Sequence, residues 1–346
     1  MADYGEQSRT ACGEQGRTVL AGIDEAGFGP ILGPLVVSTS VFRVPKNLVW
    51  GDLWGILQGS ISDKRTMLKG RLLVVDSKKA FSRSIGIRHL RRTVLAVLKH
   101  LGSPASPKGY PVASEPKSLT ELVLSLCPDC LEHLGEYPWY KQLDDYLLDG
   151  DEGDIAIGAS MLKTDLANQH IELVGLKSRC LEVAYYNRMV AAVKNKAKVL
   201  FTAVAELMQW TIEEFAGEDL EIVIDRQGGR SHYRRELQLM FPDMELRVIH
   251  EDQNRSSYEM TDANKHVRVH FIVGADSRYL PVALASMASK YIREVLVDNI
   301  NRYFRGFSDS LKPTAGYWKD GLRFIEDIKT HIPSVHFEAN QLIRCR

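Results

Sequence analysis

The sequence predicts an α/β protein: a mixed β-sheet flanked by helices, with a large insertion and a C-terminal helical region. Two observations predict this class. Short apolar segments with the composition of buried strands lie between longer segments of helical periodicity, and several of the short segments end on an acidic residue. The mixed order of strands and helices indicates an α/β or α+β architecture with a mixed sheet, and we take α/β as the prediction.

The first predicted elements are strands joined by turns. Residues 18–25 (TVLAGIDE) and 35–44 (LVVSTSVFRV) predict two buried strands, and the Gly and Pro residues between them favour an antiparallel pair. A short apolar run in residues 71–79 (RLLVVDSKK) predicts a third strand. Residues 84–100 predict an amphipathic helix, because Leu90, Val94 and Leu98 recur at helical spacing.

The composition changes from about residue 101 to residue 172, which we interpret as an insertion. This block begins with Gly, Ser and Pro residues that cannot hold regular structure, continues with a helical stretch over 118–134 and reaches an acidic stretch over 144–154. We expect residues 18–346 to form one domain that carries the insertion, and residues 1–17 to form a flexible polar tail.

Strands and helices follow again after the insertion. A helical pattern covers residues from about 180 to 215, and residues 280–300 predict a helix rich in small side chains. Between these helices, residues 219–225 (DLEIVID), 244–250 (MELRVIH) and 265–276 (KHVRVHFIVGAD) predict three strands.

Composition excludes several classes of protein. The chain has 346 residues, 45% hydrophobic and 25% charged, and no apolar run approaches the length of about 20 residues that crosses a bilayer. The formal net charge is zero, so any binding of a polyanion must be local. Five scattered cysteines argue against a disulfide framework and fit a reducing compartment. We therefore expect a cytoplasmic monomer with no membrane partner.

Four acidic residues stand where predicted strands end or a helix begins: Asp24, Glu25, Asp225 and Asp276. Sites in open α/β sheets gather at such strand ends. Two carboxylates about 4 Å apart repel by roughly 4 kcal/mol at an effective dielectric constant of 20, so a cluster of this kind needs protons or cations to neutralise it. Oxygen ligands without paired histidines indicate a hard ion, Mg²⁺ or Mn²⁺.

Several motifs resemble one known family. GIDEAGFGPILGP (residues 22–34) is similar to the ribonuclease HII signature GIDEAGRGPLAGP, and DSKKAFS (residues 76–82) resembles the DSK segment of that family. EIVIDRQGG, GADSRYLPVALASMASKYIRE, TAGYWKDGLRFIEDI and PSVHFEAN resemble further family motifs in the same order. The similarity covers both ends of the chain, whereas the middle third matches poorly.

The resemblance implies a ribonuclease H-like fold and a function. It implies metal-dependent hydrolysis of the RNA strand of RNA/DNA hybrids by a two-metal mechanism. The acids Asp24, Glu25, Asp225 and Asp276 would be both the catalytic residues and the metal ligands. The residues expected to bind the substrate are Gly27, Phe28, Gly29, Ser77, Lys78, Arg226, Arg230, Lys290 and Tyr317.

The two glycines and the two adjacent acids carry structural expectations. Gly27 and Gly29 can adopt backbone angles closed to other residues and let peptide N–H groups approach a phosphate or ribose hydroxyl. Neighbouring residues on a regular strand face opposite ways, so Asp24 and Glu25 are expected to share a site through a deformation of the strand at the glycines.

The sequence also departs from the family pattern. Phe28 replaces the usual arginine, and the insertion at about 101–172 is much longer than the usual connection. The acids could instead be solvated strand ends or helix caps. Two other functions therefore stay open: a catalytically weak nucleic-acid-binding homologue, and a related metal nuclease that acts on DNA junctions. The CPDCLEH segment (residues 127–133) lacks the second ligand pair of a structural zinc site.

Overall fold

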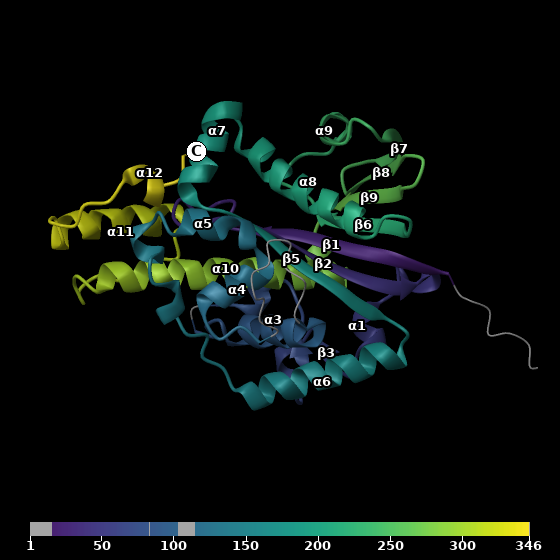
Figure 1. The fold of residues 1–346 in the computed structure, drawn as a ribbon, viewed down its shortest axis with the longest axis horizontal. Coiled ribbons are helices and arrows are strands. Elements are labelled where there is room, and N and C mark those ends of the chain that lie inside the picture. The colour runs from purple at the N-terminus through teal and green to yellow at the C-terminus, as the bar shows by residue number, and fades with distance from the viewer. Residues whose placement is uncertain (1–15, 83, 103–114, 346) are drawn as a thin grey trace, which may run out of the picture.

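The structure is a computed structural model that describes residues 16–82, 84–102 and 115–345 (Figure 1). The expected flexible tail falls mostly on residues 1–15, and much of the Gly, Ser and Pro segment falls on 103–114, so both predictions lie outside the described residues. Among the helices of the described ranges, none is long and apolar enough to cross a membrane.

A seven-stranded mixed sheet forms the centre of the molecule, with the strand order β5-β2-β1-β6-β9-β8-β7. Strands β1, β6 and β9 lie side by side and are parallel, whereas the other neighbours in the sheet are antiparallel. The predicted α/β class, with a mixed sheet flanked by helices, is confirmed. The strands are β1 (Arg17–Ala26), β2 (Leu35–Pro45), β5 (Glu172–Leu181), β6 (Asp219–Asp225), β7 (Glu245–Glu251), β8 (Arg255–Thr261) and β9 (His266–Ile272).

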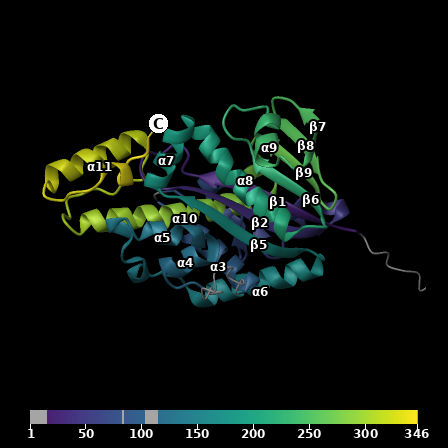
Figure 2. The same cartoon turned by 45° about the horizontal axis from the view of Figure 1, so that its top comes forward.

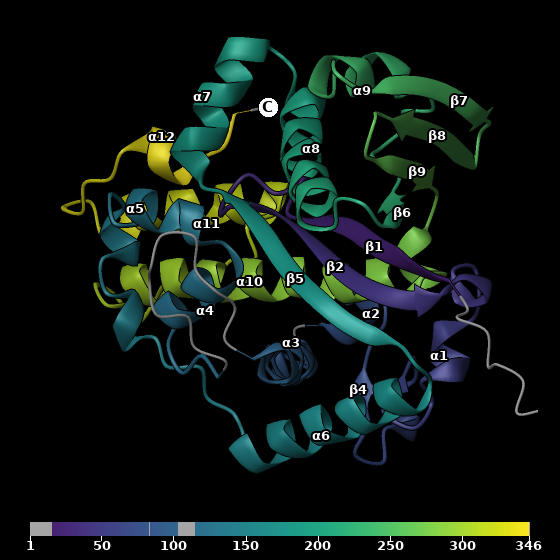
Figure 3. The same ribbon diagram turned by 45° about the vertical axis from the view of Figure 1, so that its right-hand side comes forward.

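Helices cover both faces of this sheet, so the molecule has three layers (Figure 3). On one face lie α3 (Arg88–Leu101) and α10 (Leu280–Arg305), and on the other lie α7 (Val183–Val193) and α8 (Lys196–Glu214). Alternate side chains of β1 enter the two cores, because Leu20 belongs to the core on the α10 side and Ile23 to the core on the α8 side.

The long helix α10 makes direct backbone contact with β1. A Cβ atom added to Gly22 would lie 2.2 Å from the carbonyl carbon of Pro281 and 2.2 Å from the nitrogen of Val282, so only glycine permits this crossing. Pro281 occupies the first turn of α10, where its missing N–H costs no hydrogen bond. The crossing places the start of α10 over the end of β1.

The described part of the block interpreted as an insertion contributes many side chains to the core on the α10 side. Helices α4 (Leu119–Leu126), α5 (Leu131–Leu134) and α6 (Glu152–Asn168) lie on the α10 side of the sheet, with α6 packed against α3 (Figure 2). The C-terminal helical region consists of α11 (Trp318–His331) beside α10 and α12 (Ala339–Leu342) beside α7. The remaining elements are α1 (Leu53–Ile56), β3 (Ile61–Ser62), β4 (Leu72–Leu73), α2 (Ser77–Ala80), α9 (Arg234–Met240) and the 3₁₀ turns η1 (Lys46–Leu48), η2 (Arg65–Met67), η3 (Pro128–Cys130), η4 (Pro138–Tyr140), η5 (Leu143–Asp145) and η6 (Ala275–Ser277).

Three details of the predicted elements are wrong. The apolar run at 71–79 contains only the two-residue strand β4, which pairs with β3 outside the main sheet. Strands β5 and β8 were not predicted, because charged and polar residues interrupt their apolar alternation. The helix predicted from about 180 begins only at Val183 and breaks at Lys194, which is left-handed, before Asn195 caps α8.

Candidate active site

The three parallel strands deliver acidic residues to one edge of the sheet. Asp24 and Glu25 lie near the end of β1, and Asp225 is the last residue of β6. Strand β9 ends at Ile272, and Asp276 follows in η6. Because neighbouring parallel strands end at the same edge, segments more than two hundred residues apart in the sequence meet there.

The register of β1 decides which way its two acids face. Ile23 pairs with Ile224 in the parallel register, so Asp24 and Asp225 follow as neighbours on the α10 face, and Glu25 points to the opposite face. The pairing of β1 with β2 continues without a bulge to Ala26. The strand is therefore regular through both acids, and the backbone departs from it at the glycines, where Gly27 has a φ of +95°. Because this deformation follows both acids, it does not turn Asp24 and Glu25 to the same face.

The pKa shifts of the four carboxyl groups reflect their burial and, for three of them, the charges of neighbouring acids. Burial raises the pKa of Asp24 well above its ordinary value, and the charges of Glu25 and Asp225 raise it further. Burial and Asp225 raise the pKa of Glu25 to about 7. Burial, Asp76 and Asp225 raise the pKa of Asp276 to about 6. Burial also raises the pKa of Asp225. The structure thus brings all four predicted acids into one negative cluster.

Hydrogen bonds hold these carboxylates in place. The backbone N–H of Ala275 donates to Oδ1 of Asp225 at 2.7 Å, which ties the end of β6 to the turn that carries Asp276. The backbone N–H of Glu25 donates to Oδ1 of Asp24 at 2.7 Å, and Ser289 on α10 donates to the Asp24 carbonyl oxygen at 3.0 Å. Sheet, turn and helix each contribute one of these anchors.

The DSK segment places a cation, Lys78, beside the acids. Ser77 is buried and accepts a hydrogen bond from Ser286 on α10 at 3.0 Å, which fixes α2 beside the acids. Partial burial opposes the charge of Lys78, but the carboxylates of Asp76 and Asp276 outweigh it and raise the pKa of the lysine overall. Lys78 therefore remains charged beside the acidic cluster.

The glycine loop after β1 behaves only in part as predicted. Gly27 has a φ of +95°, and a Cβ there would lie 2.6 Å from the carbonyl oxygen of Pro34, so glycine is required. Gly29 has neither a positive φ nor a neighbour within 4 Å of a Cβ, so the same expectation is wrong for it. Phe28 packs against the core on the α8 side, with the ammonium of Lys196 at 5.0 Å from its ring centroid.

The other predicted substrate-binding residues differ in their exposure and in their partners within the protein. Arg226 donates to the carbonyl oxygen of Arg230 at 2.5 Å, and Arg230 pairs with Glu236, so both arginines support their own loop. Lys290 is buried and pairs with Glu294 at 2.7 Å. Tyr317 is 52% exposed at the start of α11, and the guanidinium carbon of Arg293 lies 6.0 Å from its ring centroid. Roles in substrate binding remain predictions for all these residues.

Arg344 is a residue that sequence reasoning missed. Its side chain is 3% exposed and donates hydrogen bonds to the carbonyl oxygens of Gly27 and Pro30, while its backbone N–H donates to Ile31 at 2.8 Å. Burial and the nearby Arg293 lower the pKa of Arg344 to about 10. The C-terminal segment thus holds the glycine loop in place through Arg344. No motif in the sequence indicates this long-range contact.

The donor chemistry of the cluster fits a hard divalent cation. All four groups are carboxylates, and their raised pKa values show buried negative charge that a cation would relieve. Across the described ranges, however, no three His, Cys, Asp or Glu side chains are arranged to hold a metal ion. The Oδ1 atoms of Asp24 and Asp225 accept hydrogen bonds from backbone N–H groups, and Asp276 forms a hydrogen bond with Asp76. These carboxylates therefore interact with groups of the protein in this structure.

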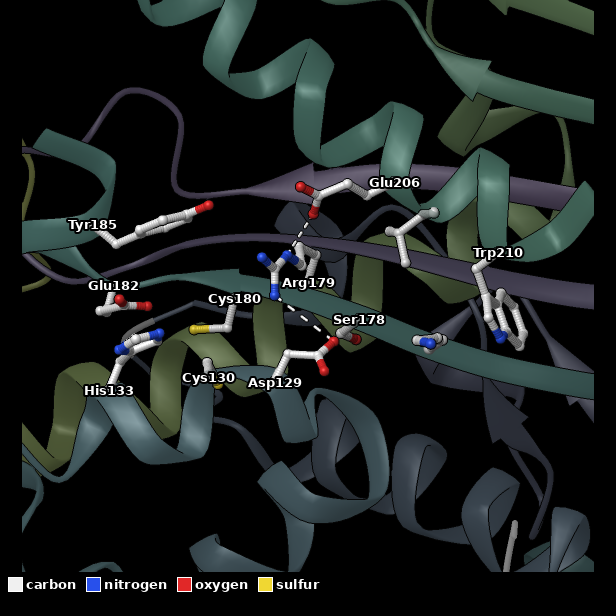
Figure 4. Close-up of a pocket in the computed structure, with 12 residues that line it drawn as sticks. Asp129, Cys130, His133, Ser178, Arg179, Cys180, Glu182, Tyr185, Glu206 and Trp210 are labelled. Carbon is white, nitrogen blue, oxygen red and sulfur yellow. Dashed lines mark hydrogen bonds and ion pairs between the residues drawn. The ribbon is translucent and has the colours of Figure 1, made fainter. Parts of the chain in front are cut away.

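A separate pocket of about 420 Å³ lies along the edge strand β5 (Figure 4). Arg179 of β5 donates to Glu206 of α8 at 2.5 Å across it, and the buried Glu182 lies at one end. The buried residues Cys127, Cys130 and Cys180 gather here, a grouping that the sequence did not reveal, and the thiol of Cys130 donates to the carbonyl oxygen of Cys127 at 3.1 Å. None of the four acids of the cluster lines this pocket.

Comparisons with known proteins complete the description. No protein-family model matches the chain, and no curated protein matches it in sequence. A chain of the PCNA–RNase HII complex from Archaeoglobus fulgidus is similar over 94% of this chain and 92% of that chain, with 17% identity and a TM-score of 0.41.

Two further solved structures are similar at the same level. For Bst-RNase HIII in complex with Mn²⁺, the values are 96% of this chain, 67% of that chain, 16% identity and a TM-score of 0.41. Aquifex aeolicus RNase H3 is similar over 94% of this chain and 71% of that chain, with 14% identity and a TM-score of 0.39. At such low identities and TM-scores, we draw no functional conclusion from these likenesses.

Proposed function

We propose that this protein is a divalent-metal-dependent endonuclease that hydrolyses the RNA strand of RNA/DNA hybrids. The observation that carries the proposal is the meeting of Asp24, Glu25, Asp225 and Asp276 at the shared edge of β1, β6 and β9. The motif resemblance assigns these four positions to catalysis, and the fold gathers them although they are far apart in the sequence.

The chain's own groups have distinct tasks in this proposal. Asp24, Asp225, Asp276 and Glu25 would hold Mg²⁺ or Mn²⁺, and Ala275 and Ser289 keep the backbone around them rigid. The metal, when bound, supplies an activated water and stabilises the departing oxygen. Lys78 places a positive charge where a phosphate would enter, and the turn at Gly27 leaves peptide groups free of side chains.

Two observations favour a second candidate, the catalytically weak nucleic-acid-binding homologue. In the part of the chain that the structure describes, no three acidic, histidine or cysteine side chains are arranged to hold a metal ion. In addition, Phe28 replaces the family arginine and packs, partly buried, against the core on the α8 side. A protein of this kind would bind hybrids without cutting them.

A cleavage assay separates these functions. Purified protein is incubated with a labelled RNA/DNA hybrid, a DNA duplex and a DNA junction in Mg²⁺, Mn²⁺ or EDTA, and the products are mapped. We expect cuts in the RNA strand of the hybrid that require the metal. Binding without cleavage supports the second candidate, and cleavage of junctions alone supports a DNA junction nuclease.

Strand β6 offers a matched pair of variants for this assay. Asp225→Asn should lower the cleavage rate by about 100-fold or more, because a carboxylate of the cluster is lost. Asp219→Asn changes the same residue type at the other end of the strand, about 20 Å away, where Asp219 pairs with Lys46 at 2.6 Å. This control should keep the rate within about twofold of the wild type. Equal rates for both variants would remove the basis of the proposal.

A further inference from the structure

A groove adjoins the acidic cluster on the side of Asp276. Its volume is about 730 Å³, and Asp276 itself belongs to its lining. One wall comes from the segment between β2 and α2, and the other from η6 and the start of α10. A nucleic-acid strand that leaves the cluster past Asp276 would enter this groove directly.

Trp50 presents an aromatic surface in the groove. Its side chain is 48% exposed, and the guanidinium carbon of Arg255 lies 5.5 Å from its ring centroid. The rings of His270 and Tyr279 meet it edge to face, with centroid distances of 5.0 and 5.8 Å. Three neighbours therefore hold the indole in one orientation while about half of it faces solvent. An anchored, exposed indole is suited to stacking.

Positive side chains line the same groove. Lys64, Lys79 and Arg278 are exposed, and within the described residues no hydrogen bond or ion pair is found for their charged groups. Of the two other acids in the lining, Asp52 already caps α1 by accepting the Trp54 N–H at 3.1 Å. The groove thus combines free cations for phosphates with an exposed indole for a base.

The indole restricts which nucleic acid fits. Inside a duplex both faces of each base are covered by its neighbours, so the body of a duplex would meet the cations but not the ring of Trp50. An unpaired nucleotide can lay its base on the indole while its phosphates contact Lys64, Lys79 and Arg278.

We propose that the Trp50 groove binds an unpaired nucleotide at the end of the hybrid. This inference rests on the proposed function, and it names the substrate class: a hybrid in which one strand continues as a single-stranded extension next to the cleaved region. The extension stacks on Trp50 and contacts the lysines of the groove.

A binding experiment tests this proposal. Blunt hybrids are compared with hybrids that carry an extension of about six nucleotides on one of the four strand ends, in EDTA so that metal-dependent cleavage cannot occur. We expect the wild type to bind at least one extended hybrid about tenfold more tightly than the blunt one. A 2-aminopurine base in that extension should lose fluorescence on binding.

Variants separate stacking from a general loss of structure. Trp50→Ala should abolish both the tenfold preference and the quenching, and Trp50→Phe should keep part of each. Phe307→Ala serves as the matched control, because Phe307 is 52% exposed and follows α10, a helix of 26 residues whose start lies beside Asp276. That helix spans about 39 Å, so the control should keep the full preference.

The cations give an independent readout. The double variant Lys64→Gln with Lys79→Gln should lower the slope of log affinity against log salt concentration by about 1.4 for the extended hybrid. Equal affinity of the wild type for blunt and all extended hybrids would overturn the groove proposal, and so would a preference that survives Trp50→Ala. If extended hybrids bind through Trp50 but no hybrid is cleaved in Mg²⁺ or Mn²⁺, the proposed function fails and the groove stands.

Discussion

Buried carboxyl groups dominate the chemistry of this protein at the residue scale. The four acids of the cluster carry raised pKa values because burial and neighbouring charges oppose their ionisation. Glu182, beside the pocket on β5, is 3% exposed, and burial raises its pKa to about 7 without a second acid of the cluster nearby. It therefore isolates the energetic effect of burial from that of the cluster.

Glu182 should make the free energy of unfolding depend on pH. The ordinary pKa of this carboxyl is 4.5 and the folded value is about 7, so the folded state holds the proton more tightly. The contribution of the protonated Glu182 to stability is therefore fully present below about pH 4.5, and it is lost as the pH rises through about 7. Glu182→Gln stays neutral, so at pH 8 it should exceed the wild type in unfolding free energy by as much as about 3 kcal/mol.

Chemical unfolding at pH 5 and pH 8 measures this difference. Glu132→Gln is the control, because Glu132 lies on the exposed side of α5 in the same region. We expect that variant to follow the wild type at both pH values. A Glu182→Gln protein with the same pH dependence as the wild type would show that burial of this carboxyl has no energetic consequence.

At the scale of elements, the crossing of α10 over β1 positions the acids. The crossing depends on Gly22, since a Cβ there would lie 2.2 Å from backbone atoms of Pro281 and Val282. Backbone atoms of a packed helix cannot move aside as the end of a flexible side chain can. Any residue larger than glycine must displace the start of α10, and with it the turn that carries Asp276.

Gly22→Ala should therefore lower the free energy of unfolding by about 3 kcal/mol, as overpacking of a core does. Gly29→Ala is the matched control for stability, because nothing lies within 4 Å of its added Cβ, and it should change the unfolding free energy by less than about 0.5 kcal/mol. Thermal or denaturant unfolding measures both. A stable Gly22→Ala protein would mean that the helix can shift without cost.

Elements differ in how far the sequence predicts them. Strands β1 and β6 were predicted because their apolar runs are nearly continuous, as expected for strands buried on both faces. Strand β9 was predicted because Val267, Val269 and Phe271 alternate with polar residues. Strands β5 and β8 were missed, since their patterns mix apolar residues with Lys, Arg, Ser and Glu. The run at 71–79 was assigned to the sheet, although a buried apolar segment of that length can pack in a core without sheet pairing.

At the scale of the whole molecule, a bound cation should stabilise the fold. The acids come from three separate strands and turns, so an ion held between them would link segments that separate on unfolding. With Mg²⁺ or Mn²⁺ at 100 times its dissociation constant, the free energy of unfolding should rise by about 2.7 kcal/mol. Thermal unfolding should show a midpoint a few degrees higher than in EDTA.

The same two variants of β6 test the origin of this shift. Asp225→Asn should lose most of the stabilisation by metal, while Asp219→Asn at the far end of the strand should retain it. This readout needs no cleavage, so it tests the metal site separately from activity. A midpoint that responds to metal equally in both variants would place the ion elsewhere.

The sequence by itself determined which residues are candidates for the proposed chemistry. Asp24, Asp225 and Asp276 could be selected because each follows an apolar run that predicts a strand, and the Gly27 turn because few other residues adopt its backbone angles. These are local properties, since strand propensity and turn geometry depend on neighbours within a few residues.

Only the tertiary structure decided how these residues are assembled. The parallel register of β1, β6 and β9 places the acids at one edge of the sheet, and α10 packs directly on Gly22. In the same way, Arg344 contacts the glycine loop, and Trp50 packs edge to face with Tyr279. Each of these contacts joins segments far apart in the chain. Their energies come from packing and burial, which depend on the partner that the fold supplies and leave no periodic signal in the sequence.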